Sequence, residues 1–193
     1  MPDKPMTEAE IQAAHVGTVR PLDTPIRIID SDPEWPRLFS REAARIQASL
    51  GDRVLLLQHV GSTAVPGLAA KPIIDMLLVV EDSADEPNYA IDLESAGYIL
   101  TIREPAWHEH RLFKGPDTDI HLHVFSSGCH EVGRMLLLRD WLRRDAPDRK
   151  LYEDTKRELA RQDWKYLQNY ADAKAPIIDA ILARAEIGMN SDG

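Results

Sequence analysis

Two short apolar runs, joined by a loop of glycine and hydroxyl residues, place the strongest constraint on how this chain can fold. Residues 54–60 and 73–80 are rich in Val, Leu and Ile, which is typical of buried strands. The loop begins with Gly61, Ser62 and Thr63. Glycine lets the backbone approach a ligand closely, and the hydroxyl residues offer O–H and backbone N–H groups to phosphate oxygens. The unit therefore predicts a phosphate cradle, although the Gly-Ser pair alone is also compatible with a plain turn.

Acidic and basic residues at the second strand extend this prediction. Asp75 lies inside an otherwise apolar strand, where an unpartnered carboxylate is costly. Its oxygen could hold a divalent metal beside the cradle, so we expect Asp75 to be a catalytic and metal-binding residue, the alternative being an ion pair with Lys71. Of several basic residues that could bind phosphate or form salt bridges, we retain Lys71 as the phosphate-binding candidate. The others are Arg111, Arg139 and Lys174.

A second group of candidate ligands lies in a predicted hairpin. Residues 111–125 read as two strands joined at 115–118, a run of turn-forming residues. If Lys114 pairs with Asp119, alternate side chains share one face. That face contains His110, Leu112, His121 and His123. We predict His121 and His123 as metal ligands, with His110 joining them by hypothesis; a polar, half-solvated sheet face is the equal alternative.

The remaining pattern predicts one α/β (α+β) domain with a helical C-terminal third. We expect a flexible or loosely docked arm over 1–25, a single domain over 26–187 and a tail over 188–193. Asp32 is expected to cap a helix that has Pro33 in its first turn. The expected strands are 26–29 and 98–102, and the expected helices are 33–50, 85–96, 131–144, 148–170 with a break near 169, and 171–186.

Charge and composition exclude several classes of partner. The chain has 23 Lys and Arg against 32 Asp and Glu, a net charge of −9, so nucleic acid is an unlikely partner. Its single cysteine, Cys129, excludes an intramolecular disulfide framework and fits a reducing compartment. The sequence shows neither a signal peptide nor an apolar run of roughly 20 residues, so we expect a cytoplasmic protein without a membrane partner.

Several pieces, taken in order, resemble the signature of the GrpB family, a branch of the nucleotidyltransferase superfamily. They are residues 32–35, 59–75, 97–98, 121–124, 139–143 and 170–185. The resemblance implies a mixed sheet with a Gly-Ser turn, an Asp-x-Asp strand and a third acid on a later strand. It also implies that Mg²⁺ or Mn²⁺ assists transfer of a nucleoside monophosphate from a nucleoside triphosphate to an acceptor, here an unknown small molecule or protein.

The sequence departs from the superfamily pattern at two acidic positions. Leu77 occupies the second position of Asp-x-Asp, and His121 and His123 occur where the later acid is expected. Leucine cannot coordinate a metal, and imidazole favours zinc, manganese or iron over magnesium. Three alternatives to a transferase follow: a non-catalytic protein that binds a nucleotide or phosphorylated metabolite, a histidine-ligated transition-metal enzyme of other chemistry, and a structural or partner-binding protein. The nucleotide, the acceptor and the oligomeric state do not follow from the sequence.

Overall fold

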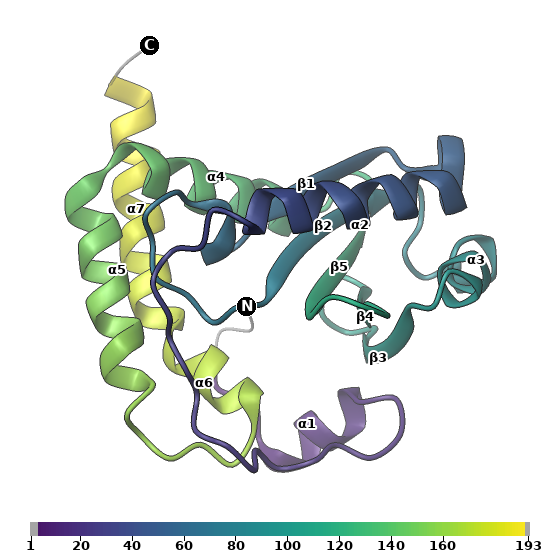
Figure 1. Ribbon diagram of the computed structural model, residues 1–193, viewed down its shortest axis with the longest axis horizontal. Helices are drawn as coiled ribbons and strands as arrows, with labels where there is room; N and C mark the ends of the chain where they lie inside the picture. Colours follow the sequence, from purple (N-terminus) through teal and green to yellow (C-terminus); the bar gives the residue numbers. More distant parts are fainter. Residues whose placement is uncertain (1–3, 192–193) are drawn as a thin grey trace.

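A mixed five-stranded sheet organises the protein in a computed structural model that describes residues 4–191 (Figure 1). Its spatial order is β1-β2-β5-β4-β3. Only β2 and β5 run parallel, and the other neighbours are antiparallel. The strands are β1 (Leu56–Val60), β2 (Ile74–Val80), β3 (Ile99–Glu104), β4 (His110–Lys114) and β5 (Ile120–Ser126). The α+β class with a mixed sheet is therefore confirmed.

Helices cover the sheet and form the C-terminal third. In Figure 1, α2 runs across the sheet, whereas α4, α5 and α7 pack together at one side of it. No helix in the described part of the chain is long and apolar enough to cross a membrane. The helices are α1 (Glu8–Ala14), α2 (Trp35–Leu50), α3 (Ala90–Ser95), α4 (His130–Arg144), α5 (Ala146–Leu159), α6 (Leu167–Ala173) and α7 (Ala175–Ser191), with 3₁₀ turns η1 (Gly51–Arg53), η2 (Ser62–Ala64) and η3 (Glu86–Asn88).

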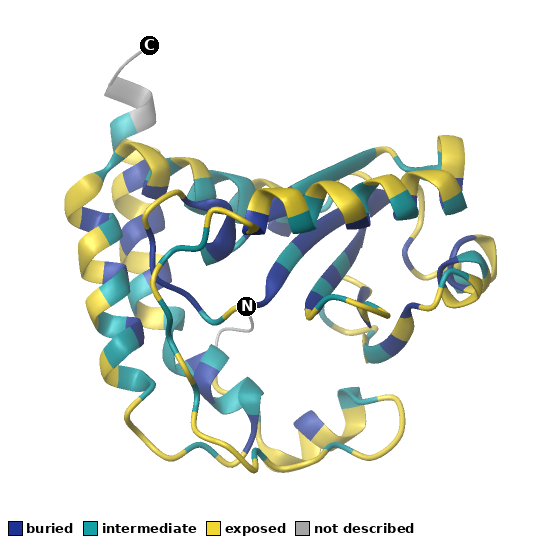
Figure 2. Cartoon of the chain, viewed as in Figure 1, coloured by how far each residue is buried: buried dark blue, intermediate teal, exposed yellow. Residues whose placement is uncertain are grey.

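The two faces of β2 pack against different neighbours. Met76 and Leu78 point into the main core under α2 and α3, with Phe113 and Leu122 of the adjoining strands. Because successive side chains of a strand point to opposite faces, Asp75, Leu77 and Val79 face the other side. Figure 2 shows β2 as the most continuously buried strand of the sheet. Asp75, the one residue of β2 that is not fully buried, therefore lies in an otherwise buried strand.

The predicted hairpin exists, but its predicted register is wrong by two residues. Lys114 pairs with His121 rather than with Asp119, and Leu112 pairs with His123. A shift of two residues leaves every side chain on its expected face, whereas a shift of one would have reversed them all. The histidines therefore gather on one face as expected.

Several predicted boundaries differ in the structure. Residues 26–29 contribute only an isolated bridge, Ile29 to Ala70, because this segment runs beside the loop and not along a strand. Helix α2 begins at Trp35 with no side-chain cap, and Asp32 instead accepts from the backbone N–H of Glu34. The long helix predicted over 148–170 breaks at 160–166, before α6.

The first residues of the described chain pack against the domain. Thr7 and Glu10 form a capping box that starts α1, and Ile11 is 1% exposed. Past the helix, the Val16 N–H donates to the Thr101 carbonyl, and the Met6 N–H donates to Asp172. The segment thus connects the β3 edge to the C-terminal helices.

Candidate functional site

The turn after β1 brings the chain against Asp75. Val60 pairs with Asp75 across β1 and β2, so Gly61 emerges directly beside the carboxylate. Gly61 has a φ of +67°, and a Cβ at this position would lie 2.3 Å from Asp75 Oδ2. Only glycine allows this approach, because it tolerates positive φ and has no side chain. Gly61 is therefore required by the geometry of the acid.

Three potential metal ligands converge beside this turn. In the parallel pair β2–β5, Asp75 lies opposite His121 and Leu77 lies opposite His123. Asp75 Oδ1 is 3.6 Å from His121 Nδ1 and 3.9 Å from His123 Nε2, and the ligand atoms of the three residues lie within 4.8 Å of one another. Their side chains are 30%, 15% and 23% exposed, respectively. The group is thus partly open, as a ligand site must be.

The electrostatics favour the ligand forms of these groups. Burial alone would raise the pKa of Asp75, but the hydrogen bond from His123 and the charges of His121, His123 and Lys174 hold it below its usual value. Burial lowers the pKa of His121 to about 4, against the opposing charge of Asp75. Near neutral pH an ionised carboxylate therefore faces a neutral His121 imidazole, the two forms that coordinate a metal.

The donor set fits a transition metal better than magnesium. One carboxylate oxygen and two imidazole nitrogens suit zinc, manganese or iron, whereas magnesium prefers oxygen ligands. A tetrahedral ion bound at roughly 2.0–2.1 Å separates its ligands by about 3.3 Å. The distances of 3.6 and 3.9 Å from Asp75 Oδ1 are close to this value, whereas the three ligand atoms together span up to 4.8 Å. Three protein ligands would leave coordination positions open for substrate.

The two hydroxyls of the turn have different surroundings. Ser62 Oγ accepts from Lys156 Nζ at 3.0 Å and also hydrogen-bonds the Tyr152 hydroxyl. The Thr63 hydroxyl is buried and donates to the Ile73 carbonyl at 3.1 Å, with His59 Nε2 at 3.0 Å on its other side. The Ser62 hydroxyl therefore faces Lys156 and Tyr152, whereas the Thr63 hydroxyl closes the loop.

Three lysines surround the turn: the sequence prediction retained Lys71, named Lys174 without retaining it, and missed Lys156. Burial lowers the pKa of Lys71 and Lys174 and lowers that of Lys156 to about 7, and all three are influenced by the charge of Asp75. Within residues 4–191, no carboxylate lies within ion-pair distance of any of them. No local motif marks Lys156 on α5, because only the packing of the C-terminal helices brings it to the loop.

An unsatisfied hydroxyl lies in the same region. Tyr170 is 2% exposed, and its hydroxyl has no hydrogen-bond partner among the described residues. Lys174 Nζ lies 4.8 Å from the centre of its ring. Buried polar groups are normally paired, so the Tyr170 hydroxyl is a hydrogen-bonding group that a polar ligand could use.

Leu77 does not belong to this site. It is fully buried in an apolar cluster with Val60 and Phe125, against which Val132 and Leu136 of α4 pack. The position that corresponds to the second acid of the Asp-x-Asp pattern is thus inside the core. The residues whose ligand atoms come together are Asp75 and the two histidines of β5.

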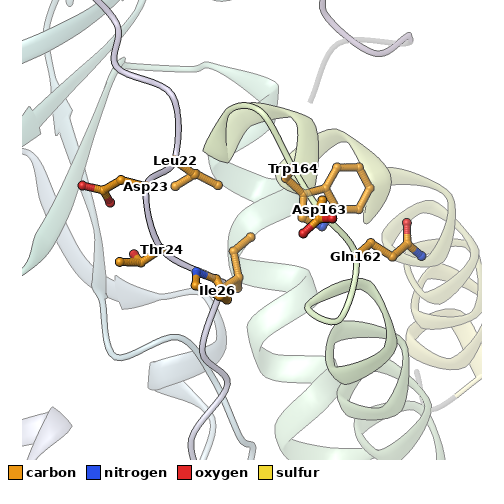
Figure 3. A pocket seen from close by; sticks show the side chains of 8 residues that line it. Leu22, Asp23, Thr24, Ile26, Gln162, Asp163 and Trp164 are labelled. Carbon is orange, nitrogen blue, oxygen red and sulfur yellow. The ribbon is translucent and has the colours of Figure 1, made fainter.

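The pocket shown in Figure 3 is separate from these residues. It has a volume of about 260 Å³ and lies between Leu22–Ile26 and the loop Gln162–Trp164. None of the predicted site residues lines it. Its walls come from the N-terminal segment and the connection before α6, so it adds nothing to the metal-ligand group.

Comparison with known proteins shows the family of this chain. The family model described as GrpB protein matches residues 25–184. The chain belongs to the GrpB family. A UPF0157 protein of Halalkalibacterium halodurans is 56% identical to it over 181 residues, which cover 94% of this chain and 93% of the relative. The crystal structure of the conserved protein GrpB from Enterococcus faecalis superposes with a TM-score of 0.72 at 28% identity, covering 82% of this chain and 96% of that one.

A GrpB-like region also occurs inside a larger protein. The dephospho-CoA kinase of Mycolicibacterium paratuberculosis is 29% identical over 210 residues, which cover 94% of this chain but only 51% of the kinase. The kinase name describes the longer protein. The present sequence contains no Gly-x-x-x-x-Gly-Lys-Ser/Thr motif, the phosphate loop of P-loop kinases.

Proposed function

We propose that this GrpB protein is a metal-dependent nucleotidyltransferase, which transfers a nucleoside monophosphate from a nucleoside triphosphate to a small-molecule or protein acceptor. The observation that carries the proposal is the meeting of two features at one turn. Asp75, His121 and His123 place their ligand atoms within 4.8 Å of one another, and the Gly61–Ser62 turn lies directly beside Asp75. A metal site adjoining a phosphate cradle is what this reaction requires.

The lysines supply the charge that a triphosphate requires. Ser62 and Lys156 already contact each other at 3.0 Å, and Lys71 and Lys174 carry further positive charge toward Asp75. Lys156 is buried and Lys71 and Lys174 are half-buried, so an anionic ligand would replace the water that these amines have lost. We assign phosphate binding to Gly61, Ser62, Lys71, Lys156 and Lys174.

In the reaction, an acceptor oxygen attacks the α-phosphorus, the bond to the bridging oxygen of the β-phosphate breaks, and pyrophosphate leaves. A divalent metal, when bound, neutralises phosphate charge and lowers the pKa of the attacking hydroxyl. Asp75, His121 and His123 hold that ion, with manganese or zinc preferred by the donor set and magnesium less suited. The Ser62 turn and the lysines align the chain of phosphates so that the leaving group lies opposite the acceptor.

Calorimetric titration of nucleoside triphosphates with Mn²⁺, Zn²⁺ or Mg²⁺ tests the proposal. We expect one triphosphate to bind with Mn²⁺ or Zn²⁺, Asp75→Asn to abolish binding, and Ser62→Ala to weaken it by about tenfold, the loss expected for one charge-assisted contact. Ser95→Ala, a hydroxyl removal on the exposed face of α3, is the matched control. If no triphosphate binds with any metal, the proposal is wrong.

The donor set itself favours a second candidate, a histidine-ligated metal enzyme of other chemistry. Two histidines and one carboxylate form the ligand set of many iron enzymes. Metal analysis of the purified protein separates the two candidates. A stoichiometric metal ion whose binding requires His121 and His123, in a protein that binds no triphosphate, would support the second candidate. Tight triphosphate binding without pyrophosphate release to any acceptor pool would instead indicate a non-catalytic binding protein.

A further inference from the structure

Two buried tyrosines of the C-terminal helices each have a lysine over the ring. On α5, Lys156 Nζ lies 4.9 Å from the centre of the Tyr152 ring. At the end of α6, Lys174 Nζ lies 4.8 Å from the centre of the Tyr170 ring. In both pairs the lysine follows the tyrosine by four residues, a spacing that places two side chains on the same side of a helix. One arrangement therefore occurs twice, on two different helices.

Both pairs lie at the turn after β1. Lys156 Nζ is 3.0 Å from Ser62 Oγ, and the charge of Lys174 is close enough to lower the pKa of Lys156 further. The charge of Asp75 acts on both lysines in the opposite direction. Two segments that are separate in the sequence thus bring two ammonium groups, each beside an aromatic ring, to the same place.

Lysines away from the turn have carboxylate partners instead. Lys150 contacts Asp154 on the surface of α5. Lys165 contacts Glu8 of the N-terminal helix. Within residues 4–191, Lys174 Nζ has neither a carboxylate at ion-pair distance nor a hydrogen-bond partner, and its contact is the ring. A ring face attracts a cation but brings no negative charge that would compete with an anionic ligand, so the N–H groups stay available.

We infer that Tyr152 and Tyr170 are positioning residues, whose rings hold Lys156 and Lys174 in place to bind a polyphosphate anion. The identity of the anion rests on the proposed function, whereas the ring–lysine pairs belong to the protein without ligand. The negative charge of the polyphosphate would take the place of the carboxylates that these two lysines lack. The attraction of the ring also opposes the loss of charge that burial favours.

Tyr170 is the position where the ring can be tested by itself, because its hydroxyl has no partner among the described residues. Tyr170→Phe keeps the ring, and its affinity for inorganic tripolyphosphate with Mn²⁺, measured by calorimetry, is the reference. Phenylalanines with one, two and three ring fluorines are then placed at position 170. Fluorine withdraws negative charge from the ring face and changes the shape little, so we expect the Kd to rise stepwise, in total about 2- to 30-fold.

Tyr166 provides the matched control. It is also buried, and its ring lies 5.3 Å from Nζ of Lys165, which already has Glu8 as a partner. The same fluorinated residues at position 166 should leave the Kd equal to that of Tyr166→Phe. Thermal unfolding confirms that each protein is folded. A Kd that stays constant with fluorine content at position 170, or that rises equally at position 166, would overturn the inference.

Proton spectra of the ligand-free protein separate this inference from the proposed function. If the ring holds Lys174, its ε-CH₂ protons are shifted upfield in Tyr170→Phe and lose this shift in Tyr170→Leu. Unshifted protons in Tyr170→Phe would show that the pair does not form. A wild-type protein that binds neither tripolyphosphate nor any nucleoside triphosphate would overturn the proposed function and the ligand named here, while the spectra still decide whether the ring holds the lysine.

Discussion

The turn residue Gly61 lies so close to Asp75 that no side chain fits between them. A Cβ on Gly61 would lie 2.3 Å from Asp75 Oδ2 and 2.9 Å from Asp75 Cβ. The first residue after β1 and a residue of β2 thus share one crowded position, because Val60 pairs with Asp75. The position of Asp75 relative to the Gly61–Ser62 turn depends on the lack of a side chain at Gly61. Substitutions at the turn therefore test the site without removing any ligand.

Gly61→Ala is expected to destabilise the protein and to weaken metal binding. The positive φ of +67° costs alanine about 1–2 kcal/mol, and the clash with Asp75 adds to it. Gly67→Ala is the matched control, because Gly67 has a φ of +76° but open space around its Cβ. Urea unfolding should show the larger loss in Gly61→Ala, and calorimetry should show weakened Mn²⁺ binding only there. Equal metal affinity in both variants would contradict this assignment.

Leu77→Asp is expected to damage the fold and not to restore an Asp-x-Asp site. Leu77 is fully buried among apolar side chains, so an acid there would be desolvated without a partner. We expect a loss of about 3 kcal/mol or more in the free energy of unfolding, measured in urea. Leu77→Met keeps the volume and should cost less than about 1.5 kcal/mol. A stable Leu77→Asp protein with enhanced magnesium binding would refute the placement of Leu77 in the core.

His59→Gln is expected to reduce sensitivity to acid. His59 is 8% exposed and stacks on Phe39, and burial lowers its pKa to about 4. The unfolded chain, with a histidine pKa of about 6.5, binds more protons between about pH 4 and 6.5, so this group makes stability rise with pH over that window. The contribution is on the order of 3 kcal/mol at most. Glutamine does not titrate, so urea unfolding at several pH values should show a shallower loss on acidification in the variant.

Lys156→Met is expected to change the pH dependence of triphosphate binding. Burial lowers the pKa of Lys156 to about 7, and phosphate binds the charged amine, so affinity should fall above pH 7 by up to about tenfold per pH unit. Methionine removes this slope and weakens binding below pH 7. Lys150→Met, on the same helix but 70% exposed, should behave as the wild type. Calorimetry across the pH range measures both effects, and an identical slope in Lys156→Met would remove Lys156 from the phosphate site.

Much of the local structure could be read from residue patterns alone. The apolar runs of β1 and β2, the glycine between them and the alternation of histidines in β5 specify strands and faces, because side-chain direction in a strand has a period of two. That alternation predicted that His121 and His123 share a face, and the family resemblance added Asp75 to the predicted group. The prediction was wrong in the β4–β5 register, where the turn chemistry did not specify which residues pair.

The tertiary structure alone decided which groups complete the site. Local sequence determines strands, turns and the face on which a residue lies, because these depend on neighbours within a few positions. The parallel pairing of β2 with β5, which sets Asp75 opposite His121, joins segments more than 40 positions apart. The contact between Lys156 and Ser62 likewise depends on helix packing. The contacts of His110 with Glu104 and with His123 depend on strand order. Such contacts are specified by burial of the whole core, which no local pattern encodes.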